Sequence, residues 1–126
     1  MKVRVYYEDT DAGGIVYHTN YIKYCERARS EAFFSKGIVP LESEKSGFVV
    51  RNIDANFLAS AKLGDMLSIE TKIITTKSSS ITLLQEVWLE EVKLFSMEIL
   101  LVYVDNGKIR RIPKDFKELF ENIAKS

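Results

Sequence analysis

The chain has 126 residues, equal numbers of basic (Lys+Arg) and acidic (Asp+Glu) residues, 18 of each, and 46% hydrophobic residues. This composition predicts a single domain over residues 1–126, with enough apolar side chains for a packed core. A net charge of zero argues against a protein that binds duplex nucleic acid, which usually carries a basic face. The chain shows neither a secretory signal nor an apolar run near the ~18 residues of a membrane span. With its single cysteine, it is expected to be cytoplasmic, with no membrane insertion.

The first predicted elements are a short strand at residues 3–7 and a helix from Tyr21 onwards. A stripe of mostly small residues recurs there at helical spacing, formed by Tyr21, Cys25, Ala28 and Ala32. Such a stripe lets a helix lie close against a sheet. Thr19 or Asn20 can cap its start, and Gly37 is well placed beyond its end.

Four strand-like segments follow, at residues 47–58, 66–74, 80–90 and 93–104. The third places Gln85 within an otherwise apolar row, and the fourth is almost continuously apolar, as in a central strand. Because the later connections are short, these strands are predicted to be antiparallel neighbours. The sequence DNGK at 105–108 is a strong hairpin signal.

Pro113 opens a final helix, where its missing N–H group costs nothing. The apolar stripe of this helix is Phe116, Leu119, Phe120 and Ile123. The predicted order is therefore β-α-β-β-β-β-α, an α+β protein with one long helix on a strongly curved antiparallel sheet. That description fits a hot-dog fold, although periodicity alone does not choose it over other sheets that carry one long helix.

The stretch YYEDTDAGGIVYH, residues 6–18, brings acidic residues, a glycine pair and the only histidine of the chain together before the helix. Asp9 and Asp11 could simply shape the turn through bonds to the backbone, and the glycine pair could be a generic turn. His18 could be a cap or a packed ring. A metal site of Asp9, Asp11 and His18 is a further alternative, although a single histidine is thin support for it.

The helix itself offers few candidates for chemistry. Cys25 lies on the small-residue face and is predicted to pack in the core rather than to act as a nucleophile. Tyr21 and Tyr24 are interpreted as packing residues. The charged positions Glu26, Arg27 and Arg29 are predicted to form a solvated or subunit-facing surface.

The segment YYEDTDAGGIVYHTNYIKYCERARSE resembles the active-site signature of the 4-hydroxybenzoyl-CoA thioesterase family, in the bacterial branch associated with the Tol–Pal envelope system. The matching positions are Asp11, Gly14, Ile15-Val16, His18, Asn20-Tyr21 and Glu26-Arg27-Ala28-Arg29. The resemblance extends weakly through the whole chain, with Ser60 in FLASAKLGD at a position where the family often has proline. It selects the hot-dog fold, a sheet wrapped around a central helix.

The resemblance implies an acyl-CoA thioesterase without a metal or other cofactor. It assigns to Asp11 the role of nucleophile or general base, and to the backbone N–H at His18 the polarisation of the thioester carbonyl. The His18 side chain and the Tyr7 hydroxyl are predicted to assist. Gly14 and Asn20 are predicted to contact the substrate.

The CoA phosphates need cationic partners, and Arg51, Lys62 and Lys77 are the candidates, although no spacing singles one out. The expected assembly is a homodimer or homotetramer with active sites at subunit boundaries, and acyl-carrier protein is an alternative carrier of the acyl group. Two other functions stay open: a hot-dog acyl hydratase or dehydratase, and a non-catalytic module that binds acyl-CoA or an acyl carrier.

Overall fold

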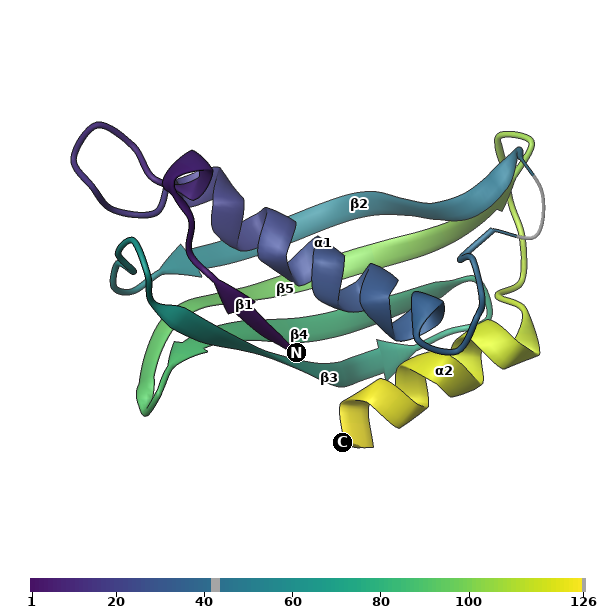
Figure 1. Cartoon of the computed structure of the whole chain (residues 1–126). Coiled ribbons are helices and arrows are strands. Elements are labelled where there is room, and N and C mark those ends of the chain that lie inside the picture. Colours follow the sequence, from purple (N-terminus) through teal and green to yellow (C-terminus); the bar gives the residue numbers. More distant parts are fainter. Residues whose placement is uncertain (42–43, 126) are drawn as a thin grey trace.

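A computed structural model describes residues 1–41 and 44–125 (Figure 1). One long helix, α1 (His18–Phe34), lies along one face of a curved antiparallel sheet, and a shorter helix, α2 (Lys114–Lys125), covers the end of that face beside β3. A 3-10 turn, η1 (Tyr7–Asp9), precedes α1. The strands are β1 (Lys2–Arg4), β2 (Ser46–Phe57), β3 (Met66–Thr76), β4 (Ser80–Leu89), β5 (Val92–Asp105) and β6 (Lys108–Ile109).

The strands follow the order β1-β3-β4-β5-β2, and β6 pairs with β5 as well. Every pair is antiparallel. The short connections predicted this arrangement for β3 with β4 and for β4 with β5, whereas β1 pairs with β3 and β2 with β5 over long stretches of sequence. The turn between β5 and β6 places Asn106 and Gly107 at positive φ, which two-residue hairpin turns of this kind require. The predicted hairpin at residues 105–108 is therefore confirmed.

The core lies between α1 and the concave face of the sheet. Cys25 and Ala28 face the sheet, and their small side chains allow the close approach that the sequence predicted. The inner face of β4 is apolar except for Gln85, which is fully buried. The Gln85 amide donates to the Cys25 carbonyl at 3.0 Å and to Thr71 Oγ1 at 3.1 Å, and its oxygen accepts from Arg29 Nη1 at 2.7 Å. All polar groups of this side chain are therefore used.

Helix α2 seals one end of this core. Phe116, Leu119 and Phe120 are buried, as their spacing predicted, and Phe33 of α1 makes edge-to-face contacts with Phe116 and Phe120. Pro113 immediately precedes the helix, and its carbonyl accepts from Lys117 N. Neither helix in the described part of the chain has the length and apolar character needed to cross a membrane.

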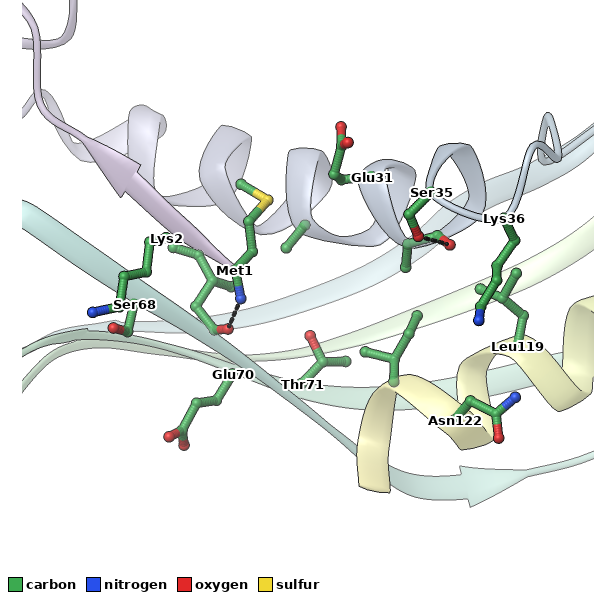
Figure 2. A pocket seen from close by; sticks show the side chains of 14 residues that line it. Met1, Lys2, Glu31, Ser35, Lys36, Ser68, Glu70, Thr71, Leu119 and Asn122 are labelled. Atoms are coloured by element: carbon green, nitrogen blue, oxygen red, sulfur yellow. Dashed lines mark hydrogen bonds between the residues drawn. The ribbon is translucent and has the colours of Figure 1, made fainter. Parts of the chain in front are cut away.

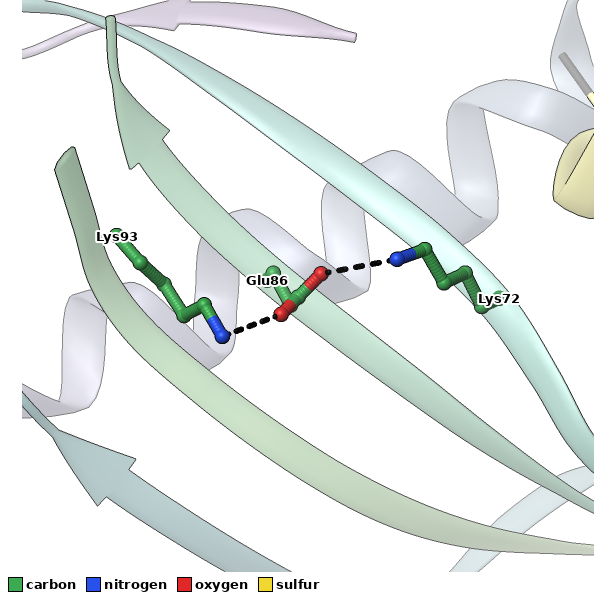
Figure 3. A network of polar contacts seen from close by, with 3 residues as sticks. All are labelled: Lys72, Glu86 and Lys93. Carbon is green, nitrogen blue, oxygen red and sulfur yellow. Dashed lines mark ion pairs between the residues drawn. The ribbon is translucent and has the colours of Figure 1, made fainter. Parts of the chain in front are cut away.

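The outer face of the sheet carries a small charged network (Figure 3). Glu86 lies between Lys93, at 2.9 Å, and Lys72, at 3.6 Å, and its side chain is almost fully buried by its neighbours. Because both lysines are partly exposed, we assign this network only a structural role.

The predicted bounds of the first two elements are wrong. The helix begins at His18 rather than Tyr21, because three polar first-turn residues, which show no apolar period, continue it towards the N-terminus. The first strand ends at Arg4 rather than at residue 7, and Tyr7 belongs to η1. At the edge of the sheet, strand β2 pairs only with β5, and its side chains Val49, Val50 and Phe57 are 48%, 45% and 50% exposed in the single chain.

Candidate active site

Asp11 lies at the tip of a short loop that a pair between Thr10 and Val16 closes at its base. Its side chain is exposed, and Oδ1 accepts a hydrogen bond from Gly13 N at 2.8 Å. A Cβ at Gly13 would lie only 3.2 Å from this same oxygen, and Gly14 has a φ of +80°. The glycine pair therefore lets the backbone fold beneath the carboxylate and fix one of its oxygens.

The first turn of α1 lies directly after this loop and is uncapped. Tyr17 is at the N-cap position, where the sequence predicted Thr19 or Asn20, and its side chain makes no capping hydrogen bond. Among the described residues, no acceptor binds the backbone N–H groups of His18 and Thr19. Free N–H groups together with the helix dipole favour negative charge at this place.

Asn20 and the neighbouring Asp9 are buried beneath the loop rather than displayed on it. Asn20 Nδ2 donates to Asp9 Oδ1 at 3.0 Å, and Tyr6 N donates to Asp9 Oδ2 at 2.9 Å. The structure therefore places the Asn20 amide against Asp9 and away from the exposed carboxylate of Asp11. The interpretation of Asp9 as a residue that shapes the turn agrees with these bonds.

The loop at residues 58–65 packs beside the Asp11 loop. Val16 N donates to the Ala61 carbonyl, and the buried Tyr21 hydroxyl accepts from Ala61 N, both at 2.9 Å. A bridge pairs Ile15 with Lys62. Of the three predicted CoA-binding cations, Lys62 is therefore the one whose backbone the fold brings to the Asp11 loop.

Arg51 and Lys77 lie elsewhere in the chain. Arg51 is an exposed residue at a register shift in the middle of β2. Lys77 lies in the turn between β3 and β4, at the opposite end of β3 from Lys62, which is roughly 30 Å away at about 3.3 Å per residue. Within one chain, these two cations do not join Lys62.

His18 is exposed and contacts two aromatic side chains. Its ring lies 4.5 Å from the Tyr17 ring and 5.9 Å, edge to face, from Phe57 at the end of β2. Phe57 in turn contacts Phe95 at 5.1 Å between ring centroids. Tyr7 is 81% exposed, on η1 just before Asp9. His18 thus stands at an apolar wall between α1 and the free edge of the sheet.

Other chemistry has little support in the described residues. Burial raises the pKa of Cys25 to about 12, so this thiol stays protonated and unreactive. No group of three His, Cys, Asp or Glu side chains among these residues is arranged to hold a metal ion. The interpretation of Cys25 as a packing residue is therefore confirmed.

A cavity of about 700 Å³ lies apart from this loop (Figure 2). It is bordered by β1, β3, the second half of α1 and the end of α2, and Ala28, Ala32 and Leu119 line it among others. None of the predicted site residues takes part in it. A smaller pocket of about 300 Å³ lies between α1 and β2, with Arg29, Phe48 and Val50 in its wall.

Comparison with known proteins identifies the family to which this chain belongs. The sequence model of the thioesterase superfamily matches residues 13–96, so the chain belongs to that superfamily. This match confirms the predicted family membership, and the hot-dog fold is confirmed with it.

Two sequence relatives and one solved structure show more closely what the chain resembles. The chain is 43% identical to the acyl-CoA thioesterase YbgC of Helicobacter pylori strain 26695, with 98% of this chain and 100% of that protein aligned. It is 41% identical to the acyl-CoA thioester hydrolase YbgC of Escherichia coli O157:H7, over 94% of this chain and 92% of that one. A probable thioesterase from Bartonella henselae superposes with a TM-score of 0.82 and 32% identity, covering 90% and 97% of the two chains.

The buried partnership of Asp9 and Asn20 was not foreseen from the sequence. One signal was available: Asn20, Tyr24 and Ala28 recur every four residues, and so share a helix face with the predicted buried stripe. A polar residue on such a face needs a buried partner, and Asp9 is the acid that the topology supplies.

Proposed function

We propose that this chain hydrolyses acyl-CoA thioesters to free CoA and a carboxylic acid, with Asp11 and the first turn of α1 as the catalytic elements. The proposal is supported by the order of these elements along the chain. An exposed carboxylate, held through one oxygen by Gly13 N, shortly precedes a helix whose first two N–H groups have no acceptor among the described residues. The names of the relatives support acyl-CoA as the substrate class.

The carboxylate can act in two ways. As a nucleophile, Asp11 attacks the thioester carbon and expels the CoA thiolate, and water then hydrolyses the resulting anhydride. As a general base, it takes a proton from water while that water attacks the same carbon, and the tetrahedral intermediate then expels CoA, which leaves as the thiol with that proton. In both routes negative charge develops on the carbonyl oxygen, and the N–H groups of His18 and Thr19 are the donors that we propose to stabilise it. The His18 ring and the exposed Tyr7 hydroxyl are the assisting groups we propose.

A homodimer formed through β2 completes this proposal. This twelve-residue strand leaves one edge without a partner in the described chain and exposes Val49, Val50 and Phe57. Long, apolar, unprotected edges pair with other strands, and a second copy of β2 supplies an identical edge. A homotetramer would then be a pair of such dimers.

The dimer would also place an acyl pocket beside the catalytic loop. In a two-fold antiparallel pair, the Ser46 end of one β2 lies next to the Phe57 end of its partner. Phe57 contacts His18, whereas Phe48, near the Ser46 end, lines the pocket of about 300 Å³ between α1 and β2. The pocket of one subunit thus adjoins the His18 of the other, and apolar walls suit an acyl group.

The CoA moiety is proposed to lie over the Lys62 side of the loop. Lys62 is the cation that the Ile15 bridge anchors there, whereas Arg51 and Lys77 could reach the same site only from the partner subunit. Acyl-carrier protein remains the alternative carrier, and the cytoplasm the proposed compartment, since the single thiol is free and buried.

A thiol-release assay over short, long and aromatic acyl-CoAs tests the function. A thioesterase releases free CoA thiol from at least one class of substrate. A hydratase would change enoyl absorbance without releasing thiol, and a binding module would do neither. Absence of thiol release from every acyl-CoA and every acyl-carrier thioester would contradict the proposal.

A further inference from the structure

Asp9 is a buried acid two residues before the exposed Asp11. It is 4% exposed, and neither of its oxygens forms an ion pair with a described Lys, Arg or His. Its charge is instead met by two neutral donors, the backbone N–H of Tyr6 at 2.9 Å and the side-chain amide of Asn20 at 3.0 Å. A buried acid without a cation costs stability, so its place in this fold needs an explanation.

Helix α1 lacks the usual device that stabilises a helix start. A Ser, Thr, Asp or Asn side chain at the N-cap would contribute about 1 kcal/mol by accepting the second or third N–H of the helix. Tyr17 at this position contributes no such bond. A capping side chain would also occupy the Thr19 N–H, one of the two donors available for the thioester oxygen.

Asp9 forms two hydrogen bonds with the start of the same helix. Its carbonyl accepts from Tyr17 N at 2.9 Å, and its carboxylate binds the side chain of Asn20, the third residue of α1. The anion therefore lies beside the positive end of the helix dipole, and is tied to the N-cap residue and to the first turn. Neither bond uses the N–H of His18 or Thr19.

We propose that Asp9, acting through Asn20, is a positioning residue that stabilises and orients the start of α1 while leaving the His18 and Thr19 N–H groups free for the substrate. The inference rests on the proposed function for what these N–H groups bind. Asp9 itself touches neither the substrate nor the reacting atoms.

The position of Tyr24 agrees with this assignment. Tyr24 is fully buried one turn after Asn20, on the same face of α1. Burial, followed by the charge of Asp9, raises the pKa of the Tyr24 hydroxyl, so that it remains a neutral phenol beside the carboxylate. The exposed Arg27 guanidinium lies over the Tyr24 ring, 6.0 Å from its centroid, and is the one cation among the described residues close to this group.

A charge swap across the Asp9–Asn20 hydrogen bond tests the inference. Asn20→Asp would place two carboxylates face to face and push the first turn out of position. Asp9→Asn/Asn20→Asp exchanges the amide and the carboxylate. The amide introduced at position 9 can still accept from Tyr6 N and donate to the acid introduced at position 20, so one negative charge stays at the helix start. Glu8→Gln, at an exposed neighbour, is the matched control.

The expected result is a fall in kcat of about 100-fold for Asn20→Asp, the size of effect that a misplacement near 1 Å can cause. KM should change by less than about 3-fold, and the double variant should recover kcat to within about 5-fold of the parent, since the coupled pair is restored. Rates are expressed per folded molecule, from circular dichroism and thermal unfolding. Glu8→Gln should match the parent.

A merely structural role would lower the thermal midpoint of Asn20→Asp but leave kcat per folded molecule unchanged, and this would overturn the inference. So would a folded double variant that stays as slow as Asn20→Asp. Asp11→Asn, measured in the same series, separates the two proposals. If Asp11→Asn keeps its activity, the proposed active site is wrong; if it is inactive while Asn20→Asp keeps kcat, only the role of Asp9 is wrong.

Discussion

Polar groups in the middle of α1 are paired, whereas the first two backbone N–H groups of the helix are unpaired among the described residues. In its middle, the Cys25 carbonyl and the Arg29 guanidinium are bound by Gln85, which has no free polar atom. In its first turn, the N–H groups of His18 and Thr19 have no acceptor in the described residues, and the N-cap side chain supplies none. The same helix therefore takes part in a fully hydrogen-bonded network at Gln85 and carries two unpaired N–H donors at its start.

This difference separates residues that hold the fold from residues available for chemistry. Buried polar groups that are fully paired rigidify a core, whereas unpaired donors at a helix start are ready to bind an anion or a developing oxyanion. We therefore expect changes near Gln85 to act on stability and changes near Asp11 to act on turnover.

The largest effect is expected at Asp11. Asp11→Asn keeps the size of the side chain and its bond from Gly13 N, but removes the base or nucleophile. Turnover should fall by about 10²–10⁴-fold, the range that general base catalysis contributes, with little change in thermal stability. Thiol release under saturating acyl-CoA measures this loss. A folded Asp11→Asn protein that turns over at the parent rate would remove Asp11 from the site.

Breaking the β2 edge should have the next largest effect. Val50→Lys/Ile53→Lys places like charges near the two-fold axis of the proposed dimer, and like charges on facing strands destabilise their pairing. We expect a monomer by light scattering and a loss of activity of at least about 10-fold, because each pocket then loses its partner. Ile74→Lys, at a 46% exposed position on β3, is the control and should stay dimeric. An active monomer would contradict the shared site.

Gln85→Leu should act on stability alone. It removes the acceptor of the half-buried Arg29 guanidinium, whereas the Cys25 carbonyl loses the Gln85 donor but keeps its bond within the helix. The free energy of unfolding should fall by about 3 kcal/mol, as expected when a buried charged group is left unpaired. Urea unfolding measures this change. If the Gln85→Leu protein kept the parent stability but lost kcat per folded molecule, the middle of α1 would serve turnover rather than stability, against our assignment.

The smallest effect is expected from capping the helix. Tyr17→Ser supplies the missing N-cap acceptor, which should raise the free energy of unfolding by up to about 1 kcal/mol. The new hydroxyl also competes for the Thr19 N–H, so kcat should fall several-fold. Tyr17→Ala, which removes the same aromatic ring without adding an acceptor, is the control. Equal kcat values for the two variants would argue that the Thr19 N–H has no role in turnover.

Local signals in the sequence were sufficient for the order of helices and strands, whereas the choice of the hot-dog fold came from the family resemblance. The alternation around Gln85, the DNGK turn and the spacing of Phe116, Leu119 and Phe120 each depend on neighbours within a few residues, and all are found in the structure. The start of α1 was misplaced because its first turn is polar and carries no apolar period.

The site was harder to predict because its geometry depends on long-range contacts. The spacing of Asn20 indicates that it is buried, but nothing in the local sequence identifies Asp9 as its partner, or shows that Ala61 is held by Tyr21 forty residues earlier. The three candidate cations looked equivalent, and only the pairing of Ile15 with Lys62 distinguishes one of them. The roles of Asp11, His18 and Tyr7 stay predictions from the family resemblance.

The most direct test of the account is a crystal structure with an acyl-CoA analogue in which a methylene replaces the thioester sulfur. This analogue keeps the carbonyl group but cannot be hydrolysed. We predict its oxygen at about 2.7–3.2 Å from the N–H nitrogen of His18 or Thr19, with the Asp11 carboxylate facing the carbonyl carbon. A carbonyl bound in the cavity of about 700 Å³ beside α2, or one that contacts neither α1 donor, would contradict the account.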